Sequence, residues 1–287
     1  MTQGDPDPTA FPSIEPLRPR SMLFTLYGDY AYPRGQAIGL RGLVTIGARL
    51  GIGQTAVRSA VARLSRQDWL EARKTGNRSS YRLTEAGRRL IDEGTRRIYK
   101  PRRRPWDGRW SLLTYSIPEA RRAARDRIRR QLAWLGFGAL GGGTYVSPRK
   151  VVEDTLTLLR AHGADRFARI FTAHLSGPGA DADLVRQCWN LEIIARRYGA
   201  FVAHYEPKRK RDVRRAAAGT LVDADAFAMR FALTHDFRRF PFIDPDLPRE
   251  LLPAGWPGFR ARELFESYHG MLTDGALRYF DGVTRDV

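Results

Sequence analysis

The stretch that decides the fold is residues 52–81, which read IGQTAVRSAVARLSRQDWLEARKTGNRSSY. We predict a short helix over 43–50 before it, a turn over 51–53, and a second helix over 54–66. In the second helix, apolar residues recur at the i, i+3, i+4, i+7 spacing that buries one face; they are Val57, Ala60, Val61 and Leu64. The pattern indicates two helices that pack across a glycine turn, with one face of the second helix left to solvent.

The outer face of this second helix carries small, polar and cationic side chains. Such side chains reach base edges and phosphates in the major groove of DNA. Two short strands, 71–74 and 79–83, follow and form a hairpin with cations near its tip, as in the wing of a winged helix-turn-helix. The predicted DNA contacts are Gln54, Thr55, Arg58, Ser59, Arg63 and Arg66 on the helix and Arg73, Lys74, Asn77 and Arg78 on the hairpin. Among these, Arg58 is the candidate for a guanine edge, and Arg63 and Arg66 are candidates for phosphates.

The charge distribution supports this interpretation. Residues 41–104 carry 17 Lys+Arg and 5 Asp+Glu, a net charge of +12 out of +18 for the whole chain. A cationic field so concentrated favours binding to phosphates, because the released counterions supply affinity. Two alternatives stay open. For the whole segment, the alternative is an Arg-rich surface helix beside an incidental hairpin. For Arg63 alone, the alternative to a phosphate contact is an ion pair with Asp68 or Glu71 inside the domain.

Length and composition indicate a folded, soluble protein. With 287 residues and 43% hydrophobic content, the chain is long enough for two or three domains with cores of their own. The single cysteine, Cys188, excludes an intramolecular disulfide and fits a reducing cytoplasm. Residues 1–19 hold acids and prolines where a signal peptide needs a basic start and an apolar core, so we expect a disordered tail. Glycines interrupt the uncharged run over 131–148, so we predict no membrane span.

A helix and a basic hinge follow the hairpin. Thr84 is placed to cap a helix over 85–98, and the proline-flanked run KPRRRP over 100–105 ends it. The cations of this hinge either bind flanking phosphate or stay solvated in a linker. The predicted division of the chain is a tail over 1–19, a winged helix-turn-helix domain over 20–99, a hinge over 100–105, a middle domain over 106–180 and a helical domain over 181–287.

The middle segment has a readable order of elements. We predict strands over 109–117, 136–140, 144–147 and 167–174, and helices over 119–135 and 151–162. The order strand, helix, strand, strand, helix, strand is the split βαβ pattern of a ferredoxin-like domain. Such domains often pair with each other, so this domain is the candidate for dimerisation. The glycine run over 141–143 joins two strands and is interpreted as a turn, because a phosphate-binding loop would open a helix.

The last third is mostly helical. Helices are predicted over 182–198, 223–234 and 260–280, and a charge run lies over 208–215. The connection over 235–258 is rich in proline and aromatic residues, which predicts a rigid, packed loop. The predicted fold class is therefore α+β, with an N-terminal winged helix-turn-helix, a central ferredoxin-like domain and a helical C-terminal domain.

Six motifs carry a family resemblance: SMLFTLYGDY (21–30), GIGQTAVRSAVARL (51–64), YRLTEAGRR (81–89), WDGRW (106–110), RRQLAWLGFG (129–138) and HDFRRFPFIDPDLPRELLPAGWPG (235–258). In this order they resemble the PaaX-like family, named for the repressor of bacterial phenylacetic acid degradation. The resemblance covers about residues 20–280. It implies a transcriptional regulator with an N-terminal winged helix, a middle domain similar to a small CRISPR-associated nuclease, and a helical C-terminal domain.

The resemblance also implies partners and an effector. Members of the family are cytoplasmic homodimers that bind palindromic double-stranded operator DNA. The implied function is repression of an aromatic-acid catabolic operon, with release from the operator by an aryl-acyl-CoA. The effector is phenylacetyl-CoA in the founding example.

No catalytic site is evident in the sequence, so we predict that the protein is not an enzyme and has no cofactor or metal. The nuclease relatives of the middle domain hold a divalent cation on an acidic residue near the end of their first strand, whereas residues 113–117 read LTYSI, without a carboxylate. The five histidines show no zinc-like pairing, and no P-loop, nucleophile elbow or dinucleotide fingerprint occurs. The alternative is a metal-dependent nuclease or an RNA-binding protein that uses the middle domain, and an assay of metal dependence separates the two.

An acyl-CoA effector needs cations for its phosphates and an apolar slot for its acyl group. The predicted ligand site consists of His235, Arg238, Arg239 and Phe240, with Trp106 and Trp110 as a second wall beside the hinge. The alternative is that the two arginines pair with Asp236, Asp244 or Asp246 while the aromatic side chains pack as core.

Overall fold

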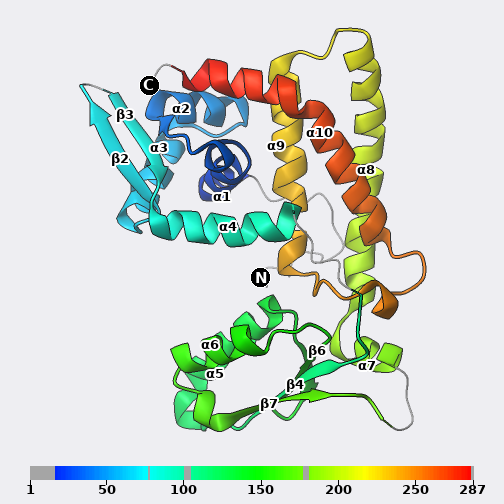
Figure 1. The fold of residues 1–287 in the computed structure, drawn as a ribbon. Helices are drawn as coiled ribbons and strands as arrows, with labels where there is room; N and C mark the ends of the chain where they lie inside the picture. Colours follow the sequence, from blue (N-terminus) through cyan, green and yellow to red (C-terminus); the bar gives the residue numbers. More distant parts are fainter. Residues whose placement is uncertain (1–16, 77, 100–104, 177–180, 286–287) are drawn as a thin grey trace, which may run out of the picture. The chain divides into compact units, whose positions relative to one another are not determined.

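A computed structural model of the chain describes residues 17–76, 78–99, 105–176 and 181–285 (Figure 1). The chain divides into two compact units. Unit 1 takes its described residues from Met1–Lys100, Arg197–Arg239 and Pro257–Val287, and unit 2 takes them from Pro101–Arg196 and Phe240–Trp256.

Unit 1 begins with short helices and a small sheet. In chain order its first elements are α1 (Pro19–Leu26), a π-helical turn η1 (Tyr27–Ala31), a 3-10 turn η2 (Tyr32–Arg34), β1 (Ile38–Gly39), α2 (Leu40–Arg49), α3 (Gln54–Arg66), β2 (Leu70–Thr75), β3 (Arg78–Leu83) and α4 (Glu85–Tyr99). The three strands form an antiparallel sheet in the order β1-β3-β2.

The buried face of α3 is the one that the sequence spacing predicts. All four predicted residues are at most 3% exposed: Val57, Ala60, Val61 and Leu64. Helix α2 lies so close that a Cβ atom on Gly47 would come within 2.5 Å of Val57 Cγ2. The turn between the helices places Gly51 at φ 78°, a backbone region that glycine adopts without steric cost. The predicted helices over 43–50 and 54–66 are therefore confirmed as α2 and α3.

The hairpin and the helix after it are also confirmed. Strands β2 and β3 pair from Leu70 with Leu83 to Thr75 with Arg78. Helix α4 then begins as predicted, because the backbone N–H of Gly87 donates to Thr84 Oγ1 at 3.0 Å. This bond satisfies a donor that the first turn of a helix leaves unpaired.

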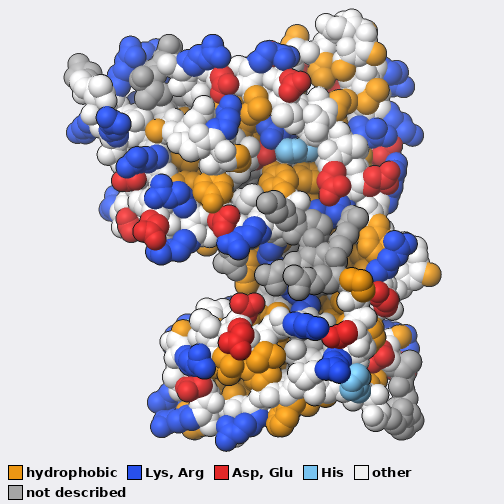
Figure 2. All heavy atoms as spheres, in the orientation of Figure 1, with side chains coloured by type: hydrophobic (Ala, Val, Ile, Leu, Met, Phe, Trp, Pro, Cys, Tyr) orange, Lys and Arg blue, Asp and Glu red, His pale blue; other side chains and the backbone are white. Residues whose placement is uncertain are grey.

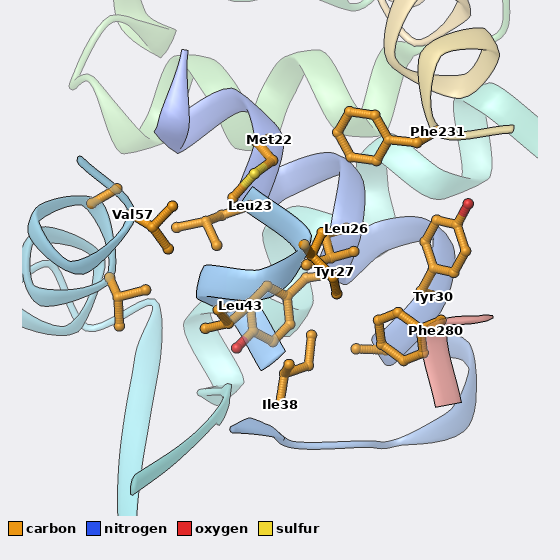
Figure 3. Packing of buried hydrophobic residues seen from close by; sticks show 14 of the residues in the cluster. Met22, Leu23, Leu26, Tyr27, Tyr30, Ile38, Leu43, Val57, Phe231 and Phe280 are labelled. Atoms are coloured by element: carbon orange, nitrogen blue, oxygen red, sulfur yellow. The ribbon is translucent and has the colours of Figure 1, made fainter. Parts of the chain in front are cut away.

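Long helices from the end of the chain complete unit 1. They are α8 (Leu191–Ala217), of which unit 1 includes the part from Arg197 on, α9 (Asp223–Phe237) and α10 (Pro257–Thr284). Helix α9 packs on α1, and α10 packs on α2. Figure 3 shows Phe231 of α9 and Phe280 of α10 in one cluster with Met22, Leu26 and Tyr30. Residues from both ends of the chain thus form one hydrophobic core.

Two predictions for the last third need correction. The predicted helix over 182–198 is two helices, α7 (Asp181–Cys188) and α8, because the chain turns at Trp189 and Asn190. The side-chain oxygen of Asn190 accepts a hydrogen bond from the N–H of Ile193 at 3.2 Å and so caps the new helix. The predicted loop from 235 onward starts too early, since the last turn of α9 includes residues up to Phe237.

Unit 2 is a four-stranded antiparallel sheet with two main helices. Its elements are β4 (Trp110–Tyr115), η3 (Glu119–Arg121), α5 (Arg122–Trp134), β5 (Gly138–Gly141), β6 (Thr144–Ser147), α6 (Val152–Ala161), η4 (Asp165–Phe167), β7 (Ala168–Ala173), α7, η5 (Phe240–Phe242) and η6 (Arg249–Leu251). The strand order is β5-β6-β4-β7. Apolar residues of α5 and α6, among them Ile128, Leu132 and Leu159, share a core with Leu113 of β4. The order of strands and helices along the chain is the predicted one.

The compact units differ from the predicted consecutive domains. Much of the predicted helical domain over 181–287 packs with the N-terminal residues in unit 1, because α9 and α10 bury apolar residues against α1 and α2. Of the predicted hinge, residues 100–104 lie outside the described residues, as do residues 1–16 of the predicted tail. Within the described part of the chain, no helix combines the length and apolarity that a membrane span requires.

Candidate nucleic-acid interface

The outer face of α3 is exposed as the sequence predicts. Its exposed side chains include Gln54, Thr55, Arg58, Ser59, Arg63 and Arg66. With its amide turned so that the oxygen faces Arg58, Gln54 accepts hydrogen bonds from Arg58 Nε at 3.1 Å and Nη2 at 3.3 Å. Gln54 therefore holds the Arg58 guanidinium beside the first turn of the helix, where polar side chains of a recognition helix meet base edges.

The hairpin adds further exposed cations. Arg73, Lys74 and Arg78 are exposed, and the predicted contact Asn77 lies outside the described residues. The antiparallel register pairs Arg73 with Ser80, whose hydroxyl donates to the Arg73 carbonyl. The sheet thus fixes the backbone beneath these cations. Figure 2 shows Lys and Arg side chains gathered over the part of unit 1 that holds the hairpin and α3.

The alternative partner proposed for Arg63 is engaged elsewhere. Glu71 accepts from Arg82 Nε at 2.7 Å, across the β2–β3 pair. Among the described residues, no carboxylate lies within ion-pair distance of Arg58, Arg63 or Arg66. The positive charge of α3 is therefore not neutralised by neighbouring side chains that the structure describes.

The predicted ligand residues of α9 contact α1. His235 Nδ1 lies 2.9 Å from Thr25 Oγ1. Burial, together with the charges of Arg238 and Arg239, lowers the pKa of His235 to about 3. Arg238 donates to the hydroxyl and the carbonyl of Ser21, and burial, with the charge of Arg239, lowers its pKa to about 10. His235 and Arg238 thus form part of the packing between α9 and α1.

The acids suggested as alternative partners of Arg238 have other contacts. Asp236 accepts from the Tyr205 hydroxyl at 2.6 Å, and burial raises the pKa of Asp236. Asp244 accepts from the backbone N–H of Asp246 at 2.7 Å. The described side-chain hydrogen bonds of Arg238 are to Ser21.

The remaining predicted ligand residues belong to unit 2. Trp106 and Trp110 meet edge to face at 5.3 Å, and Trp110 Nε1 donates to Asp181 at 2.9 Å. Trp110 also stacks on Trp189, with 6.4 Å between ring centroids. Phe240 is 3% exposed. Because His235, Arg238 and Arg239 belong to unit 1, the predicted ligand set is divided between the two units.

The neutral state of half-buried His235 has a measurable consequence. In the unfolded chain histidine binds a proton below about pH 6.5, whereas folded His235 stays neutral down to about pH 3. The unfolded state therefore binds more protons in this window, and stability falls with decreasing pH by up to about 1.4 kcal/mol per unit for one such group. We expect His235→Gln to reduce this slope between pH 6.5 and 4 in urea unfolding. An unchanged slope would place the titration on another group, and His162→Gln, at a partly exposed histidine, is the matched control.

The structure contains a buried polar cluster around Asp29 that the sequence did not predict. Asp29, in the π-helical turn, is 7% exposed, and its carboxylate accepts from Arg230 Nη2 (3.0 Å), Thr234 Oγ1 (3.1 Å) and the Tyr99 hydroxyl (2.7 Å), with His269 Nε2 at 2.9 Å. Burial opposes ionisation of Asp29, but its hydrogen bond to His269 and the charge of Arg230 outweigh burial and lower its pKa. We name these five residues the Asp29 cluster. Its only signal in the sequence is an acid within the apolar run over 21–30.

Comparisons with known proteins match most of the chain. Three family models cover the chain, described as PaaX-like protein over 18–87, PaaX protein central Cas2-like domain over 103–185, and PaaX-like protein C-terminal domain over 189–282. The chain is 33% identical over 267 residues to the transcriptional repressor PaaX of Escherichia coli (strain K12), a match that spans 92% of this chain and 83% of that protein.

A solved structure shows the same fold. It is the uncharacterized protein Rv0674 from Mycobacterium tuberculosis, which aligns with a TM-score of 0.61 over 94% of this chain and 99% of that chain at 22% identity. The three family models follow one another along the chain, so it is of the class of proteins with a PaaX-like N-terminal segment, a central Cas2-like domain and a PaaX-like C-terminal domain. The chain belongs to the PaaX family, as the sequence motifs implied.

Proposed function

We propose that this protein is a transcriptional repressor that binds operator DNA through a winged helix-turn-helix formed by α2, α3 and the β2–β3 hairpin. The observation that carries the proposal is the exposed basic face of α3, which no described carboxylate neutralises. Cations on a helix of this kind bind phosphates, and the polar residues at its start read base edges. The name of the relative from Escherichia coli, a transcriptional repressor, agrees with this function.

We further propose that the protein acts in the cytoplasm as a homodimer on palindromic DNA, with unit 2 as a ferredoxin-like dimerisation domain. Strands β5 and β7 are the edges of its sheet, and Phe171 of β7 is 50% exposed. A two-fold dimer places two copies of α3 on half-sites that are related by the same symmetry. We also propose that the protein represses an aromatic-acid catabolic operon and that an aryl-acyl-CoA releases it from the operator DNA.

Selection of bound fragments from genomic DNA tests this function. The protein is expected to enrich a small set of fragments that share a palindrome, and the genes beside them would identify the operon. Enrichment without any shared sequence would contradict a role as an operator-specific repressor.

Once an operator sequence is known, substitutions test the proposed DNA contacts of α3 and the hairpin. We expect Arg58→Ala to weaken operator binding by about 1–3 kcal/mol and to relax base preference, because it removes an arginine suited to a guanine edge. Arg78→Ala should weaken binding evenly across sequences, as removal of a phosphate-binding cation does. Titration of operator and scrambled duplexes in gel-shift assays measures both effects. Exposed Arg127 of α5 gives the control, Arg127→Ala. Unchanged operator affinity in Arg58→Ala would contradict this placement of α3.

The predicted effector residues remain part of the proposal as two separate groups, His235, Arg238 and Arg239 in unit 1 and Phe240, Trp106 and Trp110 in unit 2. Arg239 is the exposed cation among them, while His235 and Arg238 are engaged with α1. A ligand that reached Arg238 would have to replace its bonds to Ser21, and so would alter the contact between α9 and α1. This coupling supports a regulatory role for the segment, because a ligand shifts a conformation only through contacts that differ between states.

A further inference from the structure

Unit 2 contains a pocket that the predicted effector residues do not line. Its volume is about 380 Å³. Three elements form it: the end of β4, one face of α5, and the turn between β5 and β6. The lining residues are Tyr115, Ser116, Ile117, Arg125, Arg129, Ala139, Gly141, Gly142, Gly143, Thr144 and Tyr145.

The charged side chains that line this pocket are both cations, Arg125 and Arg129. Arg125 and Arg129 lie one turn apart on α5, so both side chains reach the same face of the helix. None of the described lining residues is an aspartate or a glutamate. Arg125 donates to Glu119 at 2.9 Å, but Glu119 is 69% exposed, and an exposed pair of this kind contributes little. Within the described chain, no carboxylate lies within ion-pair distance of Arg129.

Hydroxyl donors and an aromatic surface complete the pocket. The rings of Tyr115 and Tyr145 stack with 5.4 Å between centroids, and their hydroxyl oxygens lie 3.0 Å apart. Only one of these two hydroxyls can donate to the other, so the second keeps a proton for a ligand. Burial, followed by the bond to Tyr145, raises the pKa of Tyr115, so its hydroxyl stays protonated at neutral pH. Ser116 adds a third hydroxyl.

The glycine turn lies close against the end of β4. Gly141, Gly142 and Gly143 all have positive φ, and a Cβ atom on Gly143 would come within 2.4 Å of the Tyr115 carbonyl oxygen. The backbone N–H of Tyr115 donates to the Gly143 carbonyl at 3.0 Å, which anchors the turn to the end of β4. The turn joins two strands and does not begin a helix, so no helix N-terminus contributes positive charge here. The positive charge of the pocket comes from the α5 side chains Arg125 and Arg129.

We propose that this pocket binds the phosphorylated nucleotide part of the effector, with the phosphates on Arg125 and Arg129 and the base against the Tyr115 ring. Guanidinium groups bind phosphate through paired, charge-assisted hydrogen bonds. The pocket volume is at the lower end of the range for small-molecule sites, about 300–1,000 Å³, which suits one end of a larger ligand. The inference rests on the proposed function for the effector class, an acyl-CoA, whose nucleotide is an adenosine bisphosphate.

Direct binding to the full-length protein tests the pocket. Adenosine 3′,5′-bisphosphate, CoA and phenylacetyl-CoA are titrated by calorimetry into wild type, Arg129→Ala and Arg130→Ala. Arg129 and Arg130 are adjacent, exposed residues of α5, but only Arg129 lines the pocket. We expect Arg129→Ala to weaken nucleotide binding by at least about tenfold, the effect expected for removal of a charge-assisted hydrogen bond. Arg130→Ala should bind as wild type does.

The outcomes separate this inference from the proposed function. Wild type that binds no nucleotide, or Arg129→Ala that binds it as tightly as wild type, overturns the pocket, whatever the gel-shift result with operator DNA. An equal loss of operator affinity and nucleotide affinity in Arg129→Ala would assign the pocket to DNA phosphate and also overturn it. Failure of every acyl-CoA to release wild type from the operator counts against the proposed effector, while the calorimetry still reports on the pocket.

Discussion

Replacing Asp29 by alanine is expected to destabilise unit 1 by about 3–5 kcal/mol, the cost of removing one partner of a buried ion pair. The substitution leaves the Arg230 guanidinium, 5% exposed, without its carboxylate and removes the acceptor of the Tyr99 and Thr234 hydroxyls. Urea unfolding of the full chain measures the change. The matched control is Asp281→Ala, which breaks the more exposed pair with Arg34 (side chains 28% and 25% exposed) and should cost less than Asp29→Ala.

A second substitution distinguishes a buried charge from reduced packing. Adding Arg230→Met to Asp29→Ala removes the unpaired cation, so the double variant should be more stable than Asp29→Ala alone. Because the folded-state pKa of Asp29 is lowered, its contribution is full above the pKa of an unfolded aspartate and is lost as pH falls through the folded value. Wild-type stability in Asp29→Ala at neutral pH would show that the Asp29 cluster carries no net energy.

Operator affinity is expected to fall by about 10³-fold or more between roughly 50 and 200 mM salt. Six exposed cations carry this expectation in each protomer: Arg58, Arg63, Arg66, Arg73, Lys74 and Arg78. If half of them contact phosphate, a dimer makes about six contacts, and the logarithm of affinity falls with the logarithm of salt at about 0.9 per contact. Binding titrations at several salt concentrations give the slope.

Single substitutions then show which residues contribute to the salt dependence of operator affinity. Arg63→Ala or Lys74→Ala should lower the slope by about 0.9 for each phosphate that the variant no longer binds, or nearly two per dimer. Arg130→Ala, an exposed α5 residue, should leave it unchanged. Affinity that stayed constant across this salt range would exclude α3 and the hairpin as a phosphate-binding surface.

The sequence predicts elements well where one face of a helix or strand meets solvent. In α3, four buried residues alternate with exposed polar ones, so the spacing determines both the helix and its outer face. In the run over 21–30 no such contrast exists. Met22, Leu23, Thr25, Leu26, Tyr27, Asp29 and Tyr30 are all buried, because α9 and α10 cover the side that would otherwise meet water. The helix α1 and the π-helical turn therefore have no amphipathic signal.

The ligand prediction depends on contacts that sequence spacing does not reveal. His235 and Arg238 combine the chemistry of a phosphate site, yet their partners Thr25 and Ser21 lie more than 200 positions away in the chain. Likewise, the pocket at Arg125 and Arg129 depends on the β5–β6 turn meeting the end of β4. Local composition predicted the exposed basic face of α3 that we propose for DNA, whereas the contacts between distant segments required the structure.

The shared core of unit 1 sets an order of events during synthesis. The ribosome releases α1, α2 and α3 first, but Ala276 and Phe280, which seal the same core, emerge only with the last helix, α10. Until then Met22, Tyr30 and Phe227 have an open side. A nascent or prematurely terminated chain thus exposes apolar surface where the finished protein has none, which makes it a target for chaperones and proteases. Only a chain that includes α10 completes the core on which α3 packs, so products truncated before α10 are not expected to bind the proposed operator.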